Sequence, residues 1–452
     1  MNNHILLFSV LFALIFIMTT ETRAQPTKRD ASTTERIDSL TLEEAMREGL
    51  ENNHNIIIAQ RQEQQIDNNV FLGNAGFLPR VNLNGNFQHS VQNTFIEFAG
   101  DMPPIDRNNA ASTTYGASLE MQYTLFDGLS RFYEYDRLQE LGRQADAQTR
   151  LAIENTLFSI VQTFLEVARL KETVAINRKA VDLSVERLER AENTSEYGGN
   201  TQLDVLNAKV DLNTDSVNLR QSTVNLENAK RNLNVLMGAA PDHTFTVNDD
   251  FDLNASLEAE SLMEQALQQN ANLMLARYEL TTARLDEKIS SASQYPSLNL
   301  TGSYGYNRQE NEAGFIASQE QLGFTGGVSL IYTVYDANVR STRIQNASIA
   351  TQVEQENVTL TLQGLRRDVL NTYANYQNNL FLLEKEEDNL TTAQLNFERS
   401  QTALRLGQIN ATQFREAQIN LIRAQRSINN LYYQAKLSEV QLYRLSGVLS
   451  GE

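Results

Sequence analysis

The residues that could carry chemistry in this sequence are few and scattered. The four histidines are His4, His54, His89 and His243, and none lies within metal-ligand spacing of another. The chain contains no cysteine, which excludes disulfides, thiolate nucleophiles, thiol-bound zinc and the acylated cysteine of a bacterial lipoprotein. No phosphate loop, nucleophile elbow or zinc motif is present. We therefore predict that the protein is not an enzyme and needs no cofactor or metal.

The acidic residues narrow the range of partners. The formal net charge is −18, which argues against nucleic acid or anionic lipid as a partner. The stretch NDDFD, residues 248–252, could hold a calcium ion weakly, although an exposed acidic turn is the simpler interpretation.

The N-terminal stretch has the pattern of a secretory signal peptide. An apolar run extends from Ile5 to Met18, and a small residue follows at Ala24. The run is too short to span a bilayer comfortably, and no later segment approaches eighteen consecutive apolar residues. We expect export with cleavage after Ala24, and no bundle of membrane helices.

Two similar stretches, EYGGNTQLDVLNAKVDL at 196–212 and RLGQINATQFREAQINL at 405–421, indicate an internal duplication. The copies share one offset, 209 residues, at the following pairs: Asp127 and Asp336, Arg131 and Arg340, Gly198 and Gly407, Ala208 and Ala417, Gly238 and Gly447. The earlier part of each copy aligns at an offset of 217, with these pairs: Leu50 and Leu267, Asn53 and Asn270, Pro79 and Pro296. The eight-residue difference marks a surface loop.

The duplication sets the predicted domains. They are a signal peptide at 1–24, a first repeat at 25–238, an equatorial link at 239–257, a second repeat at 258–447 and a short tail at 448–452.

Within each copy, a helical pattern changes to strict alternation after the proline. In VNLNGNFQHSVQ, one face carries Val81, Leu83, Phe87 and Val91, and the other carries asparagine, glutamine and serine. This alternation predicts strands at about 80–96, 114–126, 296–307 and 322–335. Strands of about ten residues cross a bilayer when tilted, whereas a soluble sandwich usually needs about seven strands. Four strands cannot close a barrel, and an open edge cannot lie in lipid, so several chains must combine their strands.

Proline-free runs from about 129 to 195 and from about 338 to 404 predict two helices, each about 100 Å long at 1.5 Å per residue. The second run carries one heptad series: Leu362, Val369, Tyr376, Leu383, Leu390 and Phe397.

The helix after the first glycine turn carries two apolar stripes on nearly opposite sides. The first stripe is Leu203, Val210, Val217 and Val224, and the second is Val205, Leu212, Leu219, Leu226 and Leu233. A helix with two flanking neighbours needs two stripes, so we predict a curved wall of helices. A fully buried helix is the alternative, and the intervening asparagines and glutamines argue against it. We also expect the helices near 201–238 and 258–292 to stack end to end beside one long helix.

Both turns have the composition of self-capped helix reversals. Gly198 and Gly407 suit a left-handed C′ position. The N-cap pairs are Thr201 with Asp204 and Asn410 with Gln413.

The order of signal, helix, β-hairpin, long helix, glycine turn and helix, with all but the signal present twice, closely resembles the TolC-like outer-membrane efflux proteins. The local matches are LTLEEAMREGLENNHNI near the start, FLP and YPS before the strands, LFDG and VYDA after them, and the two tips. The resemblance implies an α+β membrane protein with four transmembrane β-strands and long coiled helices per chain. A homotrimer would pool these into an outer-membrane β-barrel and a periplasmic α-barrel.

The resemblance also implies site residues and partners. In that family the helical tips dock onto a periplasmic adaptor protein, which joins the channel to a proton-driven or ATP-driven inner-membrane transporter. The docking residues would be Tyr197, Gly198, Gly199, Asn200, Thr201 and Leu203, with Arg405, Leu406, Gly407, Ile409 and Asn410. The tunnel constriction would be formed by Gln413 and Glu416, with Asp204 from the first hairpin. Glutamine at 413 departs from the acidic pattern of the family, and Asp204 also suits a capping role.

The function implied is an outer-membrane exit duct of a tripartite efflux or type I secretion system, which conducts substrates passively. The alternatives are a surface or periplasmic coiled-coil structural or adhesion protein and a periplasmic enzyme on a helical scaffold. Alternating strands between long helices argue against the first alternative, and the missing chemistry argues against the second. Drugs, metal ions and secreted polypeptides leave through similar ducts, so the sequence does not name the cargo.

Overall fold

Helices and strands follow one another in the order that the sequence predicts. The computed structural model describes residues 39–196, 202–248, 251–254 and 256–449, so the predicted signal peptide at 1–24 lies outside the described residues. The helices are α2 (Leu42–Asn52), α3 (His54–Asp67), α4 (Ser130–Glu196), α5 (Gln202–Leu236), α6 (Ala259–Gln269), α7 (Ala271–Ala292), α8 (Val339–Arg405) and α9 (Ala411–Ser446). The strands are β1 (Arg80–Ile96), β2 (Ile105–Phe126), β3 (Ser297–Asn311) and β4 (Ser318–Ile331).

The four strands form one antiparallel sheet in the order β1-β2-β3-β4. The predicted bounds hold for β1 but differ from the structure for the other three strands, and β3 continues to Asn311. β2 begins at Ile105, earlier than predicted, because its polar first half pairs with β1 through backbone hydrogen bonds that need no apolar alternation. β4 ends at Ile331, which pairs with Ser297 directly after Pro296. Proline has no backbone donor, so the ladder stops there and residues 332–335 are not strand.

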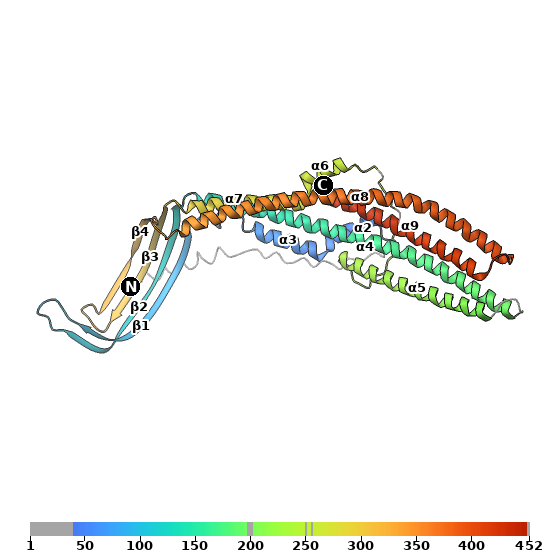
Figure 1. The fold of residues 1–452 in the computed structure, drawn as a ribbon. Coiled ribbons are helices and arrows are strands. Elements are labelled where there is room, and N and C mark those ends of the chain that lie inside the picture. The colour runs from blue at the N-terminus through green and yellow to red at the C-terminus, as the bar shows by residue number, and fades with distance from the viewer. Residues whose placement is uncertain (1–38, 197–201, 249–250, 255, 450–452) are drawn as a thin grey trace. The chain divides into compact units, whose positions relative to one another are not determined.

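Each strand continues into one column of helix. β1 follows α3, β2 leads into α4, β3 follows α7 and β4 leads into α8. Neighbouring columns pack in the same order, α3 on α4, α4 on α7 and α7 on α8. Beyond the middle of the long helices, α5 takes the place of α3 and α9 takes the place of α7. Within this unit, the sheet lies at one end of the columns and the turn between α8 and α9 at the other (Figure 1).

The predicted end-to-end partners are therefore wrong. The helices near 201–238 and 258–292 do not share a column, because α5 stacks with α3 and α9 stacks with α7. The cause is a junction that occurs once in each repeat. The side-chain amide of Asn53, the N-cap of α3, donates to the carbonyl of Leu236 at 2.7 Å. In the second repeat, Asn270 caps α7 and donates to the carbonyl of Leu445 at 3.0 Å.

A left-handed glycine completes each junction. Gly238 has φ +74, and a Cβ there would lie 2.4 Å from the carbonyl oxygen of Asn52. Gly447 has φ +76, and a Cβ there would lie 2.5 Å from the carbonyl oxygen of Gln269. Backbone therefore packs on backbone at both positions, which explains why the duplication retains these asparagines and glycines.

The predicted heptad series on α8 supplies its core contacts. Val369, Tyr376 and Leu383 are buried. Tyr376 packs with Leu262 of α6 and Leu442 of α9, and its hydroxyl donates to the carbonyl of Asn254 at 2.7 Å. Burial, with the nearby Glu439 carboxylate, raises the pKa of Tyr376 to about 12, so it stays neutral. The link before α6 is thereby fixed to the middle of α8.

One described helix, α4, contains an eighteen-residue window long and apolar enough to cross a membrane by length and composition alone. The sequence predicts that there is no bundle of membrane helices, and a single window of this kind does not make a bundle. Half of the window is buried, and the buried core helix of a soluble protein passes the same test.

We predict that Gly447→Ala lowers the thermal unfolding midpoint of the purified protein in detergent. The substitution places a methyl group against the Gln269 carbonyl and imposes a left-handed backbone on alanine, a cost of about 2 kcal/mol or more. The control is Gly364→Ala, at an open position inside α8, which should stabilise by about 1 kcal/mol through helix propensity. The unfolding midpoints are measured by circular dichroism. Equal midpoints for the two variants would contradict the close backbone packing proposed at Gly447.

Candidate functional site

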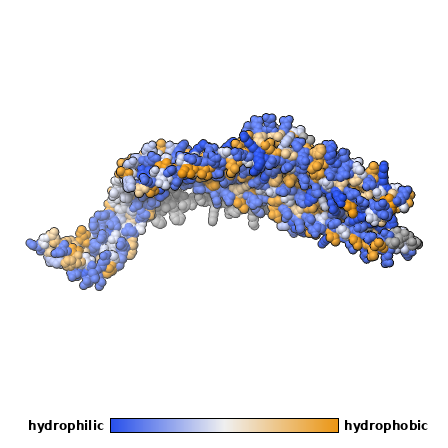
Figure 2. Space-filling view, viewed as in Figure 1, coloured by the Kyte–Doolittle hydropathy of each residue, from blue (hydrophilic) through white to orange (hydrophobic). Residues whose placement is uncertain are grey.

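The register of the sheet separates an apolar face from a polar face. Directly paired residues share a face, and one row across all four strands is entirely apolar: Leu83, Leu119, Tyr304 and Phe324. The next row is entirely polar: Asn82, Glu120, Ser303 and Thr325. The apolar residues are exposed at the level of one chain, and Figure 2 shows apolar residues gathered on the sheet between hydrophilic ones. This is the alternation of a barrel wall that has lipid on one face and water on the other.

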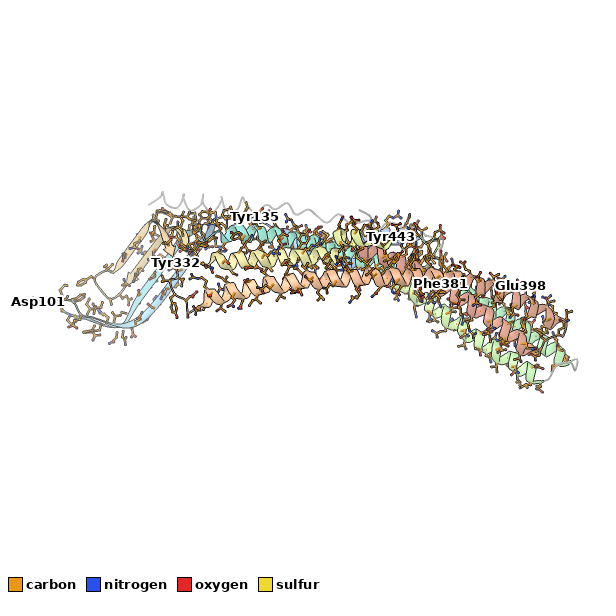
Figure 3. All side chains as sticks on the ribbon, turned by 45° about the horizontal axis from the view of Figure 1, so that its top comes forward. Asp101, Tyr135, Tyr332, Phe381, Glu398 and Tyr443 are labelled. Atoms are coloured by element: carbon orange, nitrogen blue, oxygen red, sulfur yellow. The ribbon has the colours of Figure 1, made fainter. Side chains whose placement is uncertain are left out.

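Tyrosines mark the helix end of the apolar rows. Tyr295, Tyr332 and Tyr335 are all more than half exposed. Figure 3 shows Tyr332 at the helix end of the sheet and Asp101 in the loop at its opposite end. Exposed tyrosines beside a lipid-facing sheet typically lie at the boundary between bilayer and water, because the ring is apolar and the hydroxyl is hydrated. The helix end of the sheet therefore has the aromatic boundary expected of a membrane wall.

Both edges of the sheet are open in the described part of the chain. β1 and β4 each have a single neighbouring strand, so each leaves a row of backbone donors and acceptors unpaired. The helical columns are open at the same two edges, because α3 and α5 form one outer column and α8 forms the other.

Apolar stripes follow both open columns. On α5 the first predicted stripe, Leu203, Val210, Val217 and Val224, is 39–67% exposed, whereas Leu233 of the second stripe is buried. On α8 an exposed stripe keeps heptad register: Val339, Val353, Leu360, Phe381 and Leu395. The other members of the second stripe are half-buried, so this stripe lies nearer to α4 and the first stripe is uncovered. That α5 has a second flanking helix stays a prediction.

The second tip has the capped geometry that the sequence predicts. α8 ends before Gly407, whose φ of 71 is left-handed. The side-chain oxygen of Asn410 accepts from the backbone N–H of Gln413 at 2.9 Å. The side-chain oxygen of Gln413 accepts from the backbone N–H of Asn410 at 3.0 Å. This reciprocal capping box is confirmed. Arg405 and Leu406 are exposed at the tip, and Ile409 is half-buried.

Most of the first tip lies outside the described residues. The residues concerned are Tyr197, Gly198, Gly199, Asn200 and Thr201. Leu203 follows them at the start of α5 and is 64% exposed. Asp204 lies in the first turn of α5 and is partly buried.

The predicted constriction residues differ in their freedom to face a tunnel. Gln413 uses its side chain to cap α9, whereas Glu416 is exposed one turn further on. No cluster of three or more acidic or histidine side chains that could hold a metal occurs within the part of the chain that the structure describes. Residues 249 and 250 of the NDDFD stretch lie outside the described residues, so the possibility of a weak calcium site there stays untested.

A buried ion-pair network, which the sequence did not predict, lies close to the second tip. Arg415 of α9 makes two hydrogen bonds to Asp215 of α5, at 2.8 and 2.9 Å. Asp215 also accepts from Ser184 of α4 at 2.6 Å, and Arg187 of α4 pairs with Asp211 of α5 at 2.7 Å. Three helices from both hairpins are thus joined through charges.

The network keeps Arg415 charged and sets the direction of the neighbouring Glu416 side chain. Burial alone would lower the pKa of Arg415, but its hydrogen bonds to Asp215 and the charges of Asp215 and Asp211 outweigh burial and raise the pKa. Because Arg415 points into the first hairpin, the adjacent Glu416 is turned to the exposed side of α9.

An open membrane-wall sheet continuous with an open wall of helices defines one subunit of an oligomeric channel. Comparison with known families agrees. The sequence matches the family described as outer membrane efflux protein over residues 45–239 and 262–448, which correspond to the two repeats. The chain belongs to this family. It is a channel protein of the outer membrane that extends into the periplasm, and it is not an enzyme.

Individual relatives are similar along almost their whole length. The chain is 23% identical over 415 residues to the outer membrane protein TolC of Vibrio cholerae, covering 90% of this chain and 91% of that protein. It is 21% identical over 406 residues to the pyoverdine export outer membrane protein OpmQ of Pseudomonas aeruginosa, covering 89% and 81%. The crystal structure of VceC from Vibrio cholerae has the same fold, with a TM-score of 0.74 at 16% identity over 90% of this chain and 96% of VceC.

We predict that Arg415→Met loosens the end of both hairpins. Asp215 would remain buried without its cation, and breaking a buried pair costs about 3–5 kcal/mol. Hydrogen exchange of α5 and α9 should rise in the variant. The control is Arg178→Met, which removes an exposed cation of α4 and should change stability by less than about 1 kcal/mol. Unchanged exchange in Arg415→Met would show that the network is dispensable.

Proposed function

We propose that three copies of this chain assemble into a continuous duct, a twelve-stranded outer-membrane barrel joined to twelve helical columns in the periplasm. The observation that carries this proposal is the coincidence of open edges on sheet and helices in one chain. The β1, α3 and α5 edge of one chain pairs with the β4 and α8 edge of the next, which is a heterologous interface that closes into a ring. The exposed stripes on α5 and α8 meet there and are removed from water.

The duct conducts passively and receives its cargo from an inner-membrane pump through a periplasmic adaptor, in a tripartite efflux or type I secretion system. The pyoverdine export role of one relative supports the efflux assignment. The docking surface for the adaptor is the ring of helical tips, where Arg405 and Leu406 are exposed beside the capped turn at Gly407. The docking residues predicted for the first hairpin are Leu203 and residues 197–201, which lie outside the described part of the chain. The predicted domain limits remain the working division of the chain.

We expect stepwise ion conductance when the purified protein inserts into planar bilayers. A coiled-coil adhesion protein would give none, so the absence of discrete steps contradicts the channel assignment.

The matched variants Phe324→Lys and Thr325→Lys test which face of the sheet meets lipid. A lysine on the lipid face costs about 2–4 kcal/mol near the bilayer midplane, so Phe324→Lys should insert poorly. Thr325→Lys, on the polar face, should insert and conduct.

We expect Glu416→Ala to reduce cation selectivity in single-channel recordings. Three copies of this carboxylate would surround the axis near the tips and favour cations electrostatically. Asp204→Asn should have a smaller effect if its main role is helix capping, and Gln413→Ala should mainly destabilise the tip. Unchanged conductance and ion selectivity in Glu416→Ala would remove this residue from the constriction.

A further inference from the structure

A pocket lies where the sheet meets the helices, between α4 and α7. Its volume is about 720 Å³. Residues from three places line it: Phe126, Gly128 and Leu129 at the end of β2, Tyr133 on α4, and Arg284, Lys288 and Tyr295 on or after α7. α4 and α7 are the two inner columns of the chain, so the pocket is complete within one subunit and does not depend on the proposed trimer.

The pocket opens on the apolar side of the sheet. Phe126 pairs directly with Leu298, which in turn pairs with Leu330, so all three lie on the apolar face. Phe126 and Leu129 are more than a third exposed, and Tyr295 is 62% exposed. The pocket therefore begins where the lipid-facing rows end, at the boundary of the bilayer with the periplasm.

Two cations of the pocket lie on α7 close to the end that meets the sheet. Lys288 is four residues before the end of α7, about 6 Å along the axis, and Arg284 is about 12 Å along it. The headgroup layer is roughly 5–8 Å thick on each side of a bilayer, so Lys288 lies within it and Arg284 lies just beyond it on the periplasmic side.

Neither cation is neutralised by an acidic partner among the described residues. The Lys288 ammonium lies 5.5 Å from the centre of the Tyr133 ring, and Arg284 donates to the Gln355 amide oxygen at 3.2 Å. Glu287 also lines the pocket, and its carboxylate accepts from the Thr351 hydroxyl at 2.9 Å, so the lining contains two cations and one anion.

The internal duplication shows that the fold does not require these cations. At the offset of 217 residues, the counterparts of Arg284 and Lys288 in the first repeat are Asp67 and Phe71. The architecture therefore forms without positive charge at this level. The acidic composition of the whole chain disfavours anionic surfaces in general, but this pocket is a local exception.

We propose that this pocket binds a membrane phospholipid of the periplasmic leaflet. The phosphate group accepts hydrogen bonds from Lys288 and Arg284, and the acyl chains lie over Phe126 and Leu129. The tyrosine rings of Tyr133 and Tyr295 flank the headgroup. One bound lipid per chain would fix the depth of the sheet in the bilayer.

Native mass spectrometry of the full chain in detergent tests the proposal by titration with phosphatidylglycerol, phosphatidylethanolamine or inorganic phosphate. We expect one bound lipid per chain, and roughly tenfold or greater weakening in the double variant Arg284→Gln and Lys288→Gln. Lys288→Arg should keep the binding. The control is Arg178→Gln with Lys179→Gln, two exposed cations remote from the sheet on α4, which should bind lipid like the unmodified protein.

Two results would overturn the proposal. Equal lipid binding by the double variant and the control would show that the cations take no part. Displacement of the lipid by millimolar inorganic phosphate would identify a free-phosphate site. The assay reads binding and not conductance, so its outcome is independent of the channel assignment.

Discussion

Unpaired backbone groups at the edges of a membrane sheet are the constraint on which this structure depends. The hydrocarbon core offers no water to β1 and β4, so each unpaired donor or acceptor there costs several kcal/mol. In the described part of the chain no further strand pairs with β1 or β4, and a sheet of four strands cannot close on itself. The proposed assembly relieves this cost by pairing each edge with the edge of another chain.

The helices extend the same constraint into the periplasm. Each strand leads into its own column, so the order of strands dictates the order of columns. The duplicated junctions at Gly238 and Gly447 hold the shorter helices in line beyond α3 and α7. The outer columns keep apolar stripes in heptad register, which a neighbouring subunit can cover. Sheet and helices thus impose one mode of association.

Local features could be predicted from the sequence, whereas long-range pairings could not. The two residues of the capping box, Asn410 and Gln413, are three positions apart, so the box can be predicted from their types and spacing in the sequence. The stripe beginning at Leu203 follows from helical spacing alone. In contrast, Arg415 and Asp215 are 200 residues apart, and nothing local distinguishes them from solvated charges. The stacking of α5 on α3 depends on how Asn53 meets the end of α5, which periodicity does not encode.

Disulfide trapping across the open edges tests the account most directly, because the chain has no cysteine of its own. One cysteine would replace Asn84 on β1, and a second would be moved along β4 from Gln319 to Gly327. At the β4 position that lies opposite residue 84 of the neighbouring chain, oxidation in membranes should form intermolecular disulfides. The largest covalent product should contain three chains. Products confined to a single chain at every register, or an open-ended ladder, would contradict the closed assembly.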